Sequence, residues 1–324
     1  MNNLFIPSTV APASIVEVVA AVIIQADGQF LLTRRPLGKI YSGYWEFPGG
    51  KVEKDESLLH ALDRELWEEL GIQVRVAYPW ITRIFTYSHA TVRLHFFRVM
   101  KWEGRLLPRE KQELFWQFPH RVEVSPILPA NGPIIQSLLL PPIYAITRAN
   151  EIGIESALEQ IEQAMEGGLR LLQVREKQMA PDKLWKFSQQ VLALAHAHQA
   201  KVMINGDPEL TYKIGADGVH FTSSQLMTMS SRPKAEYGLC SASCHNAEEL
   251  FAAEQLGLDF VVLGPVQPTH SHSRASSLGW KKFSMLIFGC SMPVYALGGL
   301  CLEDLPIAQE MGAHGIAMMR GIAN

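Results

Sequence analysis

A short stretch of glycines and glutamates, residues 49–72, constrains this chain more than any other part of its sequence. It reads GGKVEKDESLLHALDRELWEELGI. Leucines recur at helical spacing between positions 58 and 70, Asp55 or Ser57 can cap the helix start, and Gly71 can end it. The pattern predicts a glycine loop at 49–50 followed by a helix over 57–70. Ahead of it, the apolar run 16–24, a turn at Asp27-Gly28 and residues 30–33 predict a β-hairpin.

Three glutamates of that helix share one face. Glu65, Glu68 and Glu69 stand at i, i+3 and i+4, and this spacing makes side chains neighbours on a helix. Packed carboxylates repel one another, whereas a hard dication such as Mg2+ removes the repulsion and prefers oxygen ligands. A solvated acidic helix face is the structural alternative. The glycines favour a metal site, because their backbone can approach the helix and offer the Gly49 carbonyl.

The pattern extends to an arginine and a fourth glutamate, since Glu56 lies two helical turns before Arg64 and is placed to hold its guanidinium. In full it is Gly50, five residues, Glu56, seven residues, then Arg64-Glu65-Leu66-x-Glu68-Glu69-x-Gly71-Ile72. This matches the Nudix box at every defined position, and residues 16–138 resemble a Nudix hydrolase of the MutT-like branch. The resemblance implies an α/β/α sandwich with a mixed sheet, and Mg2+ as cofactor with Mn2+ able to replace it.

Three stretches outside the box carry the resemblance to this branch, which hydrolyses oxidised guanine nucleoside triphosphates. Arg35 in LLTRRP is implied to lie near the nucleotide, with Phe47 before the box also at the substrate. Glu110 is implied as a further metal ligand, and Glu113 competes for that role. Asn131 in LPAN is implied to read the purine edge, since a buried Asn offers both a donor and an acceptor. The structural alternatives are a surface charge, a loop acid and a helix cap.

The implied reaction converts 8-oxo-dGTP to 8-oxo-dGMP and pyrophosphate, which sanitises the nucleotide pool and so serves DNA replication and repair. Gly49, Glu65, Glu68, Glu69 and Glu110 would hold the metal. Glu65 or Glu69 would orient or deprotonate the attacking water, and the sequence leaves both open. The box indicates a diphosphatase more firmly than it indicates the substrate.

The second half of the chain has a different pattern. Beyond Pro141-Pro142, short β-rich runs alternate with helical patterns such as 154–166 and 181–199. Eight strands separated by helices predict a parallel (β/α)8 TIM barrel, and the chain divides into domains 1–140 and 141–324. The expected strands are 143–147, 171–176, 201–205, 218–221, 237–242, 260–264, 294–297 and 315–319.

Residues 142–324 resemble thiamine phosphate synthase. Polar groups at the end of the second strand and glycines after the last two strands suit a phosphorylated ligand. The expected ligand site comprises Gln173, Arg175, Lys177, Asn205, Gly298, Gly299 and Gly321.

The same half departs from the family pattern where Mg2+ should bind. The Asn-Asp after the third strand is Asn205-Gly206, with Asp207 displaced by one, and a second aspartate is replaced in the stretch ending at Gln225. A phosphate-gripping lysine is replaced at His272. Because expelling pyrophosphate needs Mg2+, the barrel is expected to have lost its synthase chemistry.

Composition limits the remaining function classes. A net charge of −3 argues against tight binding to duplex nucleic acid. The N-terminus lacks a basic signal region, and no apolar run approaches membrane-spanning length, so a cytoplasmic protein is expected. Four cysteines, Cys240, Cys244, Cys290 and Cys301, are expected to be core thiols. The oligomeric state cannot be read from the sequence.

Two alternatives to the leading hypothesis stay open. The Nudix half could cleave a thiamine-pathway pyrophosphate, which would give the fusion a metabolic sense. The barrel could instead retain synthase activity or serve as a binding module for a phosphorylated ligand.

Overall fold

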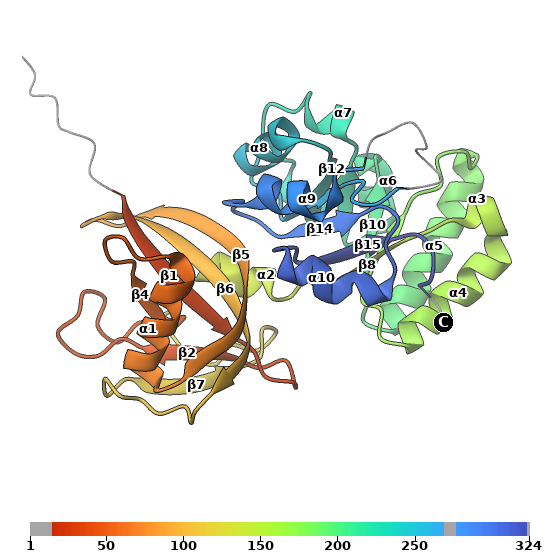
Figure 1. Ribbon diagram of the computed structural model, residues 1–324. Coiled ribbons are helices and arrows are strands. Elements are labelled where there is room, and N and C mark those ends of the chain that lie inside the picture. The colour runs from red at the N-terminus through yellow and green to blue at the C-terminus, as the bar shows by residue number, and fades with distance from the viewer. Residues whose placement is uncertain (1–14, 269–276, 323–324) are drawn as a thin grey trace, which may run out of the picture. The chain divides into compact units, whose positions relative to one another are not determined.

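The computed structural model describes residues 15–268 and 277–322 (Figure 1). Its internal contacts divide the chain into two compact units. The first takes in the chain up to Ala77, Thr82–Gln117 and Val124–Ala130. The second takes in Tyr78–Ile81, Phe118–Glu123 and the chain from Asn131 onwards.

The first unit contains a mixed four-stranded sheet, as the sequence predicts. Its order is β4 (Gly49–Lys51), β1 (Val16–Ile23), β6 (Thr91–Glu103) and β5 (Gln73–Thr86). β1 runs parallel to β6 and antiparallel to β4. β4 is an edge strand, and its pairing with β1 fixes the two glycines next to a buried strand of the sheet.

A second sheet corrects one expectation. Residues 30–33 were expected to form a hairpin with the first strand, but β2 (Phe30–Arg34) pairs antiparallel with β3 (Trp45–Glu46) and β7 (Glu113–Gln117). A single bridge from Ile24 to Phe30 is the link recorded with the first strand. β2 is buried over its first four residues, so it is covered on both faces, which an edge hairpin would not be.

The box helix is α1 (Leu58–Leu70), and it confirms the predicted helix closely. Ser57 caps its start by accepting a hydrogen bond from the His60 N–H, and Gly71 ends it in the left-handed conformation. Leu62, Leu66 and Leu70 are fully buried in one cluster with side chains of β1. α1 packs on both β1 and β4, and its Glu65 carboxylate lies directly against Gly50 of β4.

The second unit is the predicted (β/α)8 barrel, closed by eight parallel strands in the order β10-β11-β12-β13-β14-β15-β8-β9. All eight expected strands are present. Their bounds are β8 (Ile143–Ile146), β9 (Leu171–Val174), β10 (Lys201–Asn205), β11 (Gly218–Phe221), β12 (Leu239–Cys244), β13 (Phe260–Leu263), β14 (Val294–Leu297) and β15 (Gly315–Met318).

Helices surround the barrel, and α2 (Gly132–Ser137) precedes it (Figure 1). The barrel helices are α3 (Ala149–Ile152), α4 (Ile154–Glu166), α5 (Pro181–Ala197), α6 (Pro208–Ile214), α7 (Ser223–Leu226), α8 (Ala247–Gln255), α9 (Gly279–Ile287) and α10 (Leu305–Glu310), with two 3-10 turns at Ala235–Tyr237 and Leu302–Asp304. Inside the strands, Tyr144, Phe260 and Tyr295 pack ring against ring.

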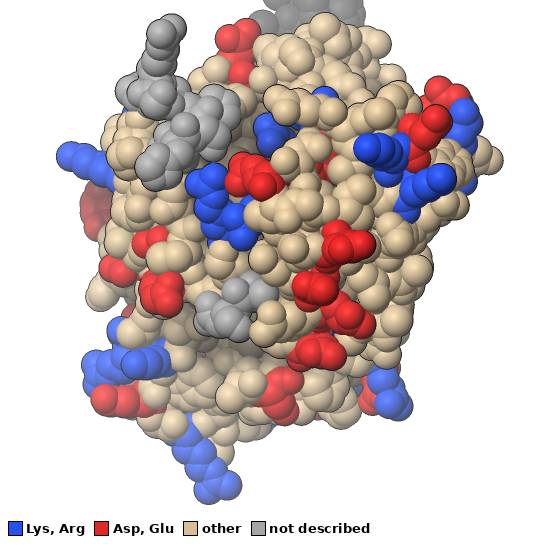
Figure 2. Space-filling model, turned by 90° about the vertical axis from the view of Figure 1, so that its right-hand side faces the viewer, with Lys and Arg blue, Asp and Glu red and all other residues tan. Residues whose placement is uncertain are grey.

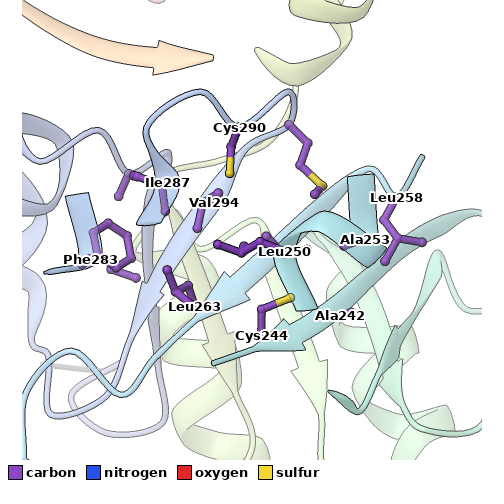
Figure 3. Close-up of a cluster of buried hydrophobic side chains, with 14 of the residues drawn as sticks. Ala242, Cys244, Leu250, Ala253, Leu258, Leu263, Phe283, Ile287, Cys290 and Val294 are labelled. Carbon is purple, nitrogen blue, oxygen red and sulfur yellow. The ribbon is translucent and has the colours of Figure 1, made fainter. Parts of the chain in front are cut away.

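Three of the four cysteines are core thiols. Cys244 and Cys290 lie in the cluster between the strands and α8 and α9, beside Leu250 and Val294 (Figure 3). Burial raises the pKa of Cys240 to about 11 and that of Cys290 to about 12. The expectation is wrong for Cys301, which is exposed at the start of a 3-10 turn.

Candidate functional site

The two glycines before the box helix lie in β4, not in a loop; a side chain at Gly49 would clash with backbone, and one at Gly50 would displace the Glu65 carboxylate. A Cβ on Gly49, whose φ is +145°, would stand 2.1 Å from the Val19 carbonyl oxygen. A Cβ on Gly50 would stand 2.3 Å from the Glu65 carboxylate. Glycine therefore lets this backbone pass directly against the acidic face of α1.

Two box glutamates are partly buried against this backbone. The Gly49 N–H donates to Glu69 at 3.2 Å. Burial, followed by the charges of Glu46, Glu110 and Glu65, raises the pKa of Glu69 to about 8. Burial also raises the pKa of Glu65. These carboxylates therefore lie close enough to disfavour one another's charged forms.

Arg64 organises the other box carboxylates. Its Nε and Nη2 donate to the two oxygens of Glu56, each at 3.0 Å, which confirms the predicted pair. Its Nη1 donates to Glu65 at 2.9 Å and to Glu68 at 3.3 Å. Hydrogen bonding to Arg64 lowers the pKa of Glu56 to about 2. Arg64 is thus positioned to orient two of the expected metal ligands.

The donor set fits a hard divalent cation in its chemistry. Glu65 and Glu69 are oxygen donors whose burial and mutual repulsion disfavour their charged forms, and a cation would relieve this. Across residues 15–268 and 277–322, no three His, Cys, Asp or Glu side chains are arranged so that they could already hold a metal ion. Glu65 and Glu68 are turned to the Arg64 guanidinium instead.

Of the two candidate loop glutamates, Glu110 lies near this face. Its charge acts on Glu65 and Glu69, and its carboxylate accepts from Lys39 Nζ at 2.7 Å. Glu113 lies in β7 and pairs with Arg34 at 2.8 Å. The geometry favours Glu110 as the further ligand.

The expected nucleotide-contacting residues lie in different surroundings. Arg35 forms a two-pronged ion pair with Glu46 at 2.6 and 2.7 Å. Phe47 is buried, with its ring packed between Phe30 and Phe96. Asn131 is buried at the start of α2 and makes no side-chain cap. Their roles towards a substrate stay predictions.

An aromatic group in the first unit was not singled out from the sequence. Tyr41 lies 5.3 Å from both Tyr44 and Tyr87 between ring centroids, and Tyr87 stacks on His89 at 5.6 Å. Burial, followed by the charge of Glu46, raises the pKa of Tyr87 to about 12. The run of tyrosines and glycines between Arg35 and Trp45 was the sequence signal for this group. The partner rings, those of Tyr87 and His89, lie far along the chain, so the signal was incomplete.

In the barrel, Gln173 points into a buried neutral network. Its amide donates to Tyr144 Oη at 2.8 Å, and Tyr144 lies 3.3 Å from His220 Nδ1. His220 also contacts Ser241 and Ser243 at 2.8 and 2.9 Å. Burial lowers the pKa of His220 to about 3, so its ring is neutral at pH 7.

The other expected ligand residues lie at the carboxyl ends of the strands. The charge of Arg175 lowers the pKa of Lys177, so two cations stand close together after β9. Gly298 and Gly299 have positive φ, and a Cβ there would meet Pro265 at 2.6 Å and the Pro268 carbonyl at 2.7 Å. Both glycines therefore serve loop packing, whatever ligand they face. Gly321 also has positive φ, at +68°.

The barrel positions expected to hold Mg2+ are bound to one another. The Gln225 amide donates to the Gly206 carbonyl at 2.8 Å, while its oxygen accepts from the Thr222 N–H at 3.0 Å. Asp207 caps α6 by accepting from the Leu210 N–H at 2.8 Å. Because neutral groups fill both places and the nearby carboxylate is engaged, these residues do not fit Mg2+. His272 lies outside the described residues.

Charged side chains of both signs are spread over the face shown in Figure 2. Several acidic side chains form one stretch, while other acidic side chains and the basic ones lie in separate groups. Within the described part of the chain, none of the helices has the length and apolar character needed to cross a membrane.

Comparison with known proteins gives the families of both halves. Residues 15–138 match the NUDIX domain model, and residues 143–322 match the model described as thiamine monophosphate synthase. The chain therefore belongs to the thiamine monophosphate synthase family through its second half. Its first half is a MutT-like Nudix pyrophosphohydrolase domain, from a family that generally uses a divalent metal.

Individual relatives match one half each. A putative thiamine-phosphate synthase 2 of Aquifex aeolicus is 33% identical over 55% of this chain and 95% of its own length. CTP pyrophosphohydrolase of Escherichia coli is 41% identical over 38% of this chain and 91% of its own length. A solved thiamine phosphate pyrophosphorylase from Pyrococcus furiosus aligns at 22% identity over 55% of this chain and 84% of that one, with a TM-score of 0.46.

Proposed function

We propose that the Nudix unit hydrolyses a nucleoside triphosphate to the monophosphate and pyrophosphate, with 8-oxo-dGTP as its physiological substrate in the cytoplasm. The observation that carries the proposal is the acidic face of α1, which the Gly49-Gly50 backbone meets without an intervening side chain. The match to the MutT-like branch supports an oxidised guanine base.

The residues of the box have distinct roles in this reaction. Glu65, Glu68, Glu69 and the Gly49 carbonyl, with Glu110, would hold the cation. When bound, Mg2+ or Mn2+ supplies charge neutralisation at the phosphates and a more acidic water. Glu65 or Glu69 would accept a proton from the attacking water. Arg64, itself held by Glu56, is a positioning residue for Glu65 and Glu68.

The bond changes follow from attack at the β-phosphorus. The water oxygen bonds to this phosphorus, and the bond to the oxygen that bridges to the α-phosphorus breaks. That oxygen leaves with the nucleoside monophosphate, and the new P–O bond remains in pyrophosphate. Asn131 and Arg35 would discriminate the base and take no part in these bond changes.

A specific comparison favours a second substrate. The relative at 41% identity is named CTP pyrophosphohydrolase, so a cytosine nucleotide is the alternative. The experiment is a ranking of kcat/KM with Mg2+ for 8-oxo-dGTP, dGTP, CTP and thiamine pyrophosphate. The proposal requires 8-oxo-dGTP to rank first by at least tenfold over dGTP; a higher rank for CTP or thiamine pyrophosphate would replace it.

For the barrel we infer that thiamine phosphate synthesis has been lost and that binding of a phosphorylated ligand remains. The hydrogen bond between Gln225 and Gly206 supports this inference, and so does the pair of cations at Arg175 and Lys177. The test is to express the full chain in a strain that lacks its own synthase, with the two thiamine precursors and Mg2+ supplied. Growth without thiamine would overturn the inference.

A further inference from the structure

Lys39 lies in the loop between β2 and β3, which is closed at its base. The Arg35 N–H donates to the Tyr44 carbonyl at 2.8 Å, and the Gly43 N–H donates to the Arg35 carbonyl at 3.0 Å. The Arg35 guanidinium donates to the Ile40 carbonyl at 2.8 Å. The backbone on either side of Lys39 is therefore held in place.

The partner of Lys39 is fixed from the other side. The loop that carries Glu110 is attached to the end of α1, because the Leu107 N–H donates to the Leu70 carbonyl and the Arg109 N–H to the Glu69 carbonyl, both at 2.9 Å. The Gln112 amide donates to the same Glu69 carbonyl at 3.0 Å. Two separately anchored loops thus bring one cation and one carboxylate together beside the box.

We propose that Lys39 is a phosphate-binding residue of the hydrolase, and that in the nucleotide-free protein it competes with the divalent cation for Glu110. The proposal rests on the proposed function and names a residue outside the box. Its ammonium lies 2.7 Å from Glu110, and the charge of Glu69 also acts on it. Lys39 therefore places a positive charge beside the acidic face, where the phosphates of a substrate held by the cation would need a counter-charge.

The exchange of partners is physically easy. Lys39 and Glu110 have side chains that are 46% and 42% exposed, and ion pairs this exposed are weak. A lysine ammonium is a point charge on a flexible four-carbon stem, so it can turn while the loop stays in place. Once a cation engages Glu110, the phosphate oxygens become the nearest anions for the freed ammonium.

Two titrations of the full chain test this without turnover. The first measures Mn2+ binding to the nucleotide-free protein by electron paramagnetic resonance. The second measures binding of inorganic pyrophosphate with Mg2+ by calorimetry. The variants are Lys39→Met, which removes the charge, and Lys39→Arg, which keeps it. Lys101→Met, an exposed lysine on β6, is the matched control.

The two readouts should move in opposite directions for Lys39→Met. Mn2+ affinity should rise about two- to fivefold, since an exposed competing ion pair is lost. Pyrophosphate affinity should fall about tenfold, since a charge-assisted hydrogen bond is lost. Lys39→Arg and Lys101→Met should behave like the wild type.

Unchanged pyrophosphate affinity in Lys39→Met would overturn the phosphate contact, and unchanged Mn2+ affinity would overturn the competition. An equal effect of Lys101→Met would overturn both, because net charge alone would then explain the shifts. Failure of the proposed function would look different: no nucleotide would be hydrolysed by the wild type, while both titrations would remain measurable.

Discussion

The Nudix unit and the barrel both place polar side chains against a tightly packed framework, but among the described residues only the Nudix unit gathers carboxylates where a metal ion is expected. In the Nudix unit, the charges of Glu65 and Glu110 disfavour the charged form of Glu69. In the barrel, Gln225 and Gly206 satisfy each other as neutral groups. Assembled like charges cost stability unless something binds them, whereas paired neutral groups need no ligand. The difference is why we propose cation-dependent chemistry for the Nudix unit and not for the Gly206 and Gln225 positions of the barrel.

The largest effect expected from this comparison is on hydrolysis. Glu68→Gln removes one negative charge at nearly constant volume, so a hard cation loses a ligand without a cavity being formed. Activity on every nucleotide should fall at least a hundredfold while the unfolding temperature stays unchanged. Glu53→Gln, at a position that the box leaves undefined, is the control. If Glu68→Gln kept near wild-type activity at saturating Mg2+, the acidic face of α1 would not take part in the reaction.

Asn131→Ala should mainly reduce the preference for 8-oxo-dGTP over dGTP. A lost base-edge contact costs about 1–3 kcal/mol, or roughly ten- to a hundredfold in selectivity. The measurement is kcat/KM for both nucleotides. An equal fall in kcat for both would make Asn131 a structural or catalytic residue.

The neutral barrel interior predicts a pH dependence of stability. Burial lowers the pKa of His220 from 6.5 to about 3. Between these two pH values, His220 is protonated in the unfolded chain but neutral in the folded barrel. Stability contributed by the neutral ring is complete above about pH 6.5 and is lost as the pH falls towards 3. His220→Gln should flatten the fall in unfolding temperature between pH 7 and 4.5. An unchanged slope would contradict this.

The smallest expected effect comes from the barrel positions that replace the metal ligands. Gln225→Ala leaves the Gly206 carbonyl and the Thr222 N–H without their partner, which should cost about 1–2 kcal/mol of stability. Nucleotide hydrolysis should not change. Chemical denaturation and the nucleotide assay check the two statements, and a loss of hydrolysis would mean that the barrel contributes to the reaction.

Local signals were enough to predict part of this molecule. The bounds of α1 follow from Ser57, the leucine spacing and Gly71, all within one short stretch. The eight barrel strands follow from alternation of short β-branched runs with helices. Such features depend on neighbours in sequence, which is why they could be predicted.

Contacts between distant residues were the part that could not be predicted. The wrong hairpin arose because the main partner of β1 is β6, which begins at Thr91, and not the adjacent β2. Glu110 could not be separated from Glu113 until Lys39 and Arg34 were seen as their respective partners. Gln225 could be read as a missing carboxylate, but its bond to Gly206 could not be foreseen.

The central claim is that the glutamates of α1 form the tight cation site, and Mn2+ binding to the full chain tests it most directly. Electron paramagnetic resonance should be compared between the wild type and a variant carrying Glu65→Gln, Glu68→Gln and Glu69→Gln together. The triple variant should lose all tight Mn2+ binding while the barrel remains folded. Retention of a tight site in that variant would place a cation outside the box and contradict the account.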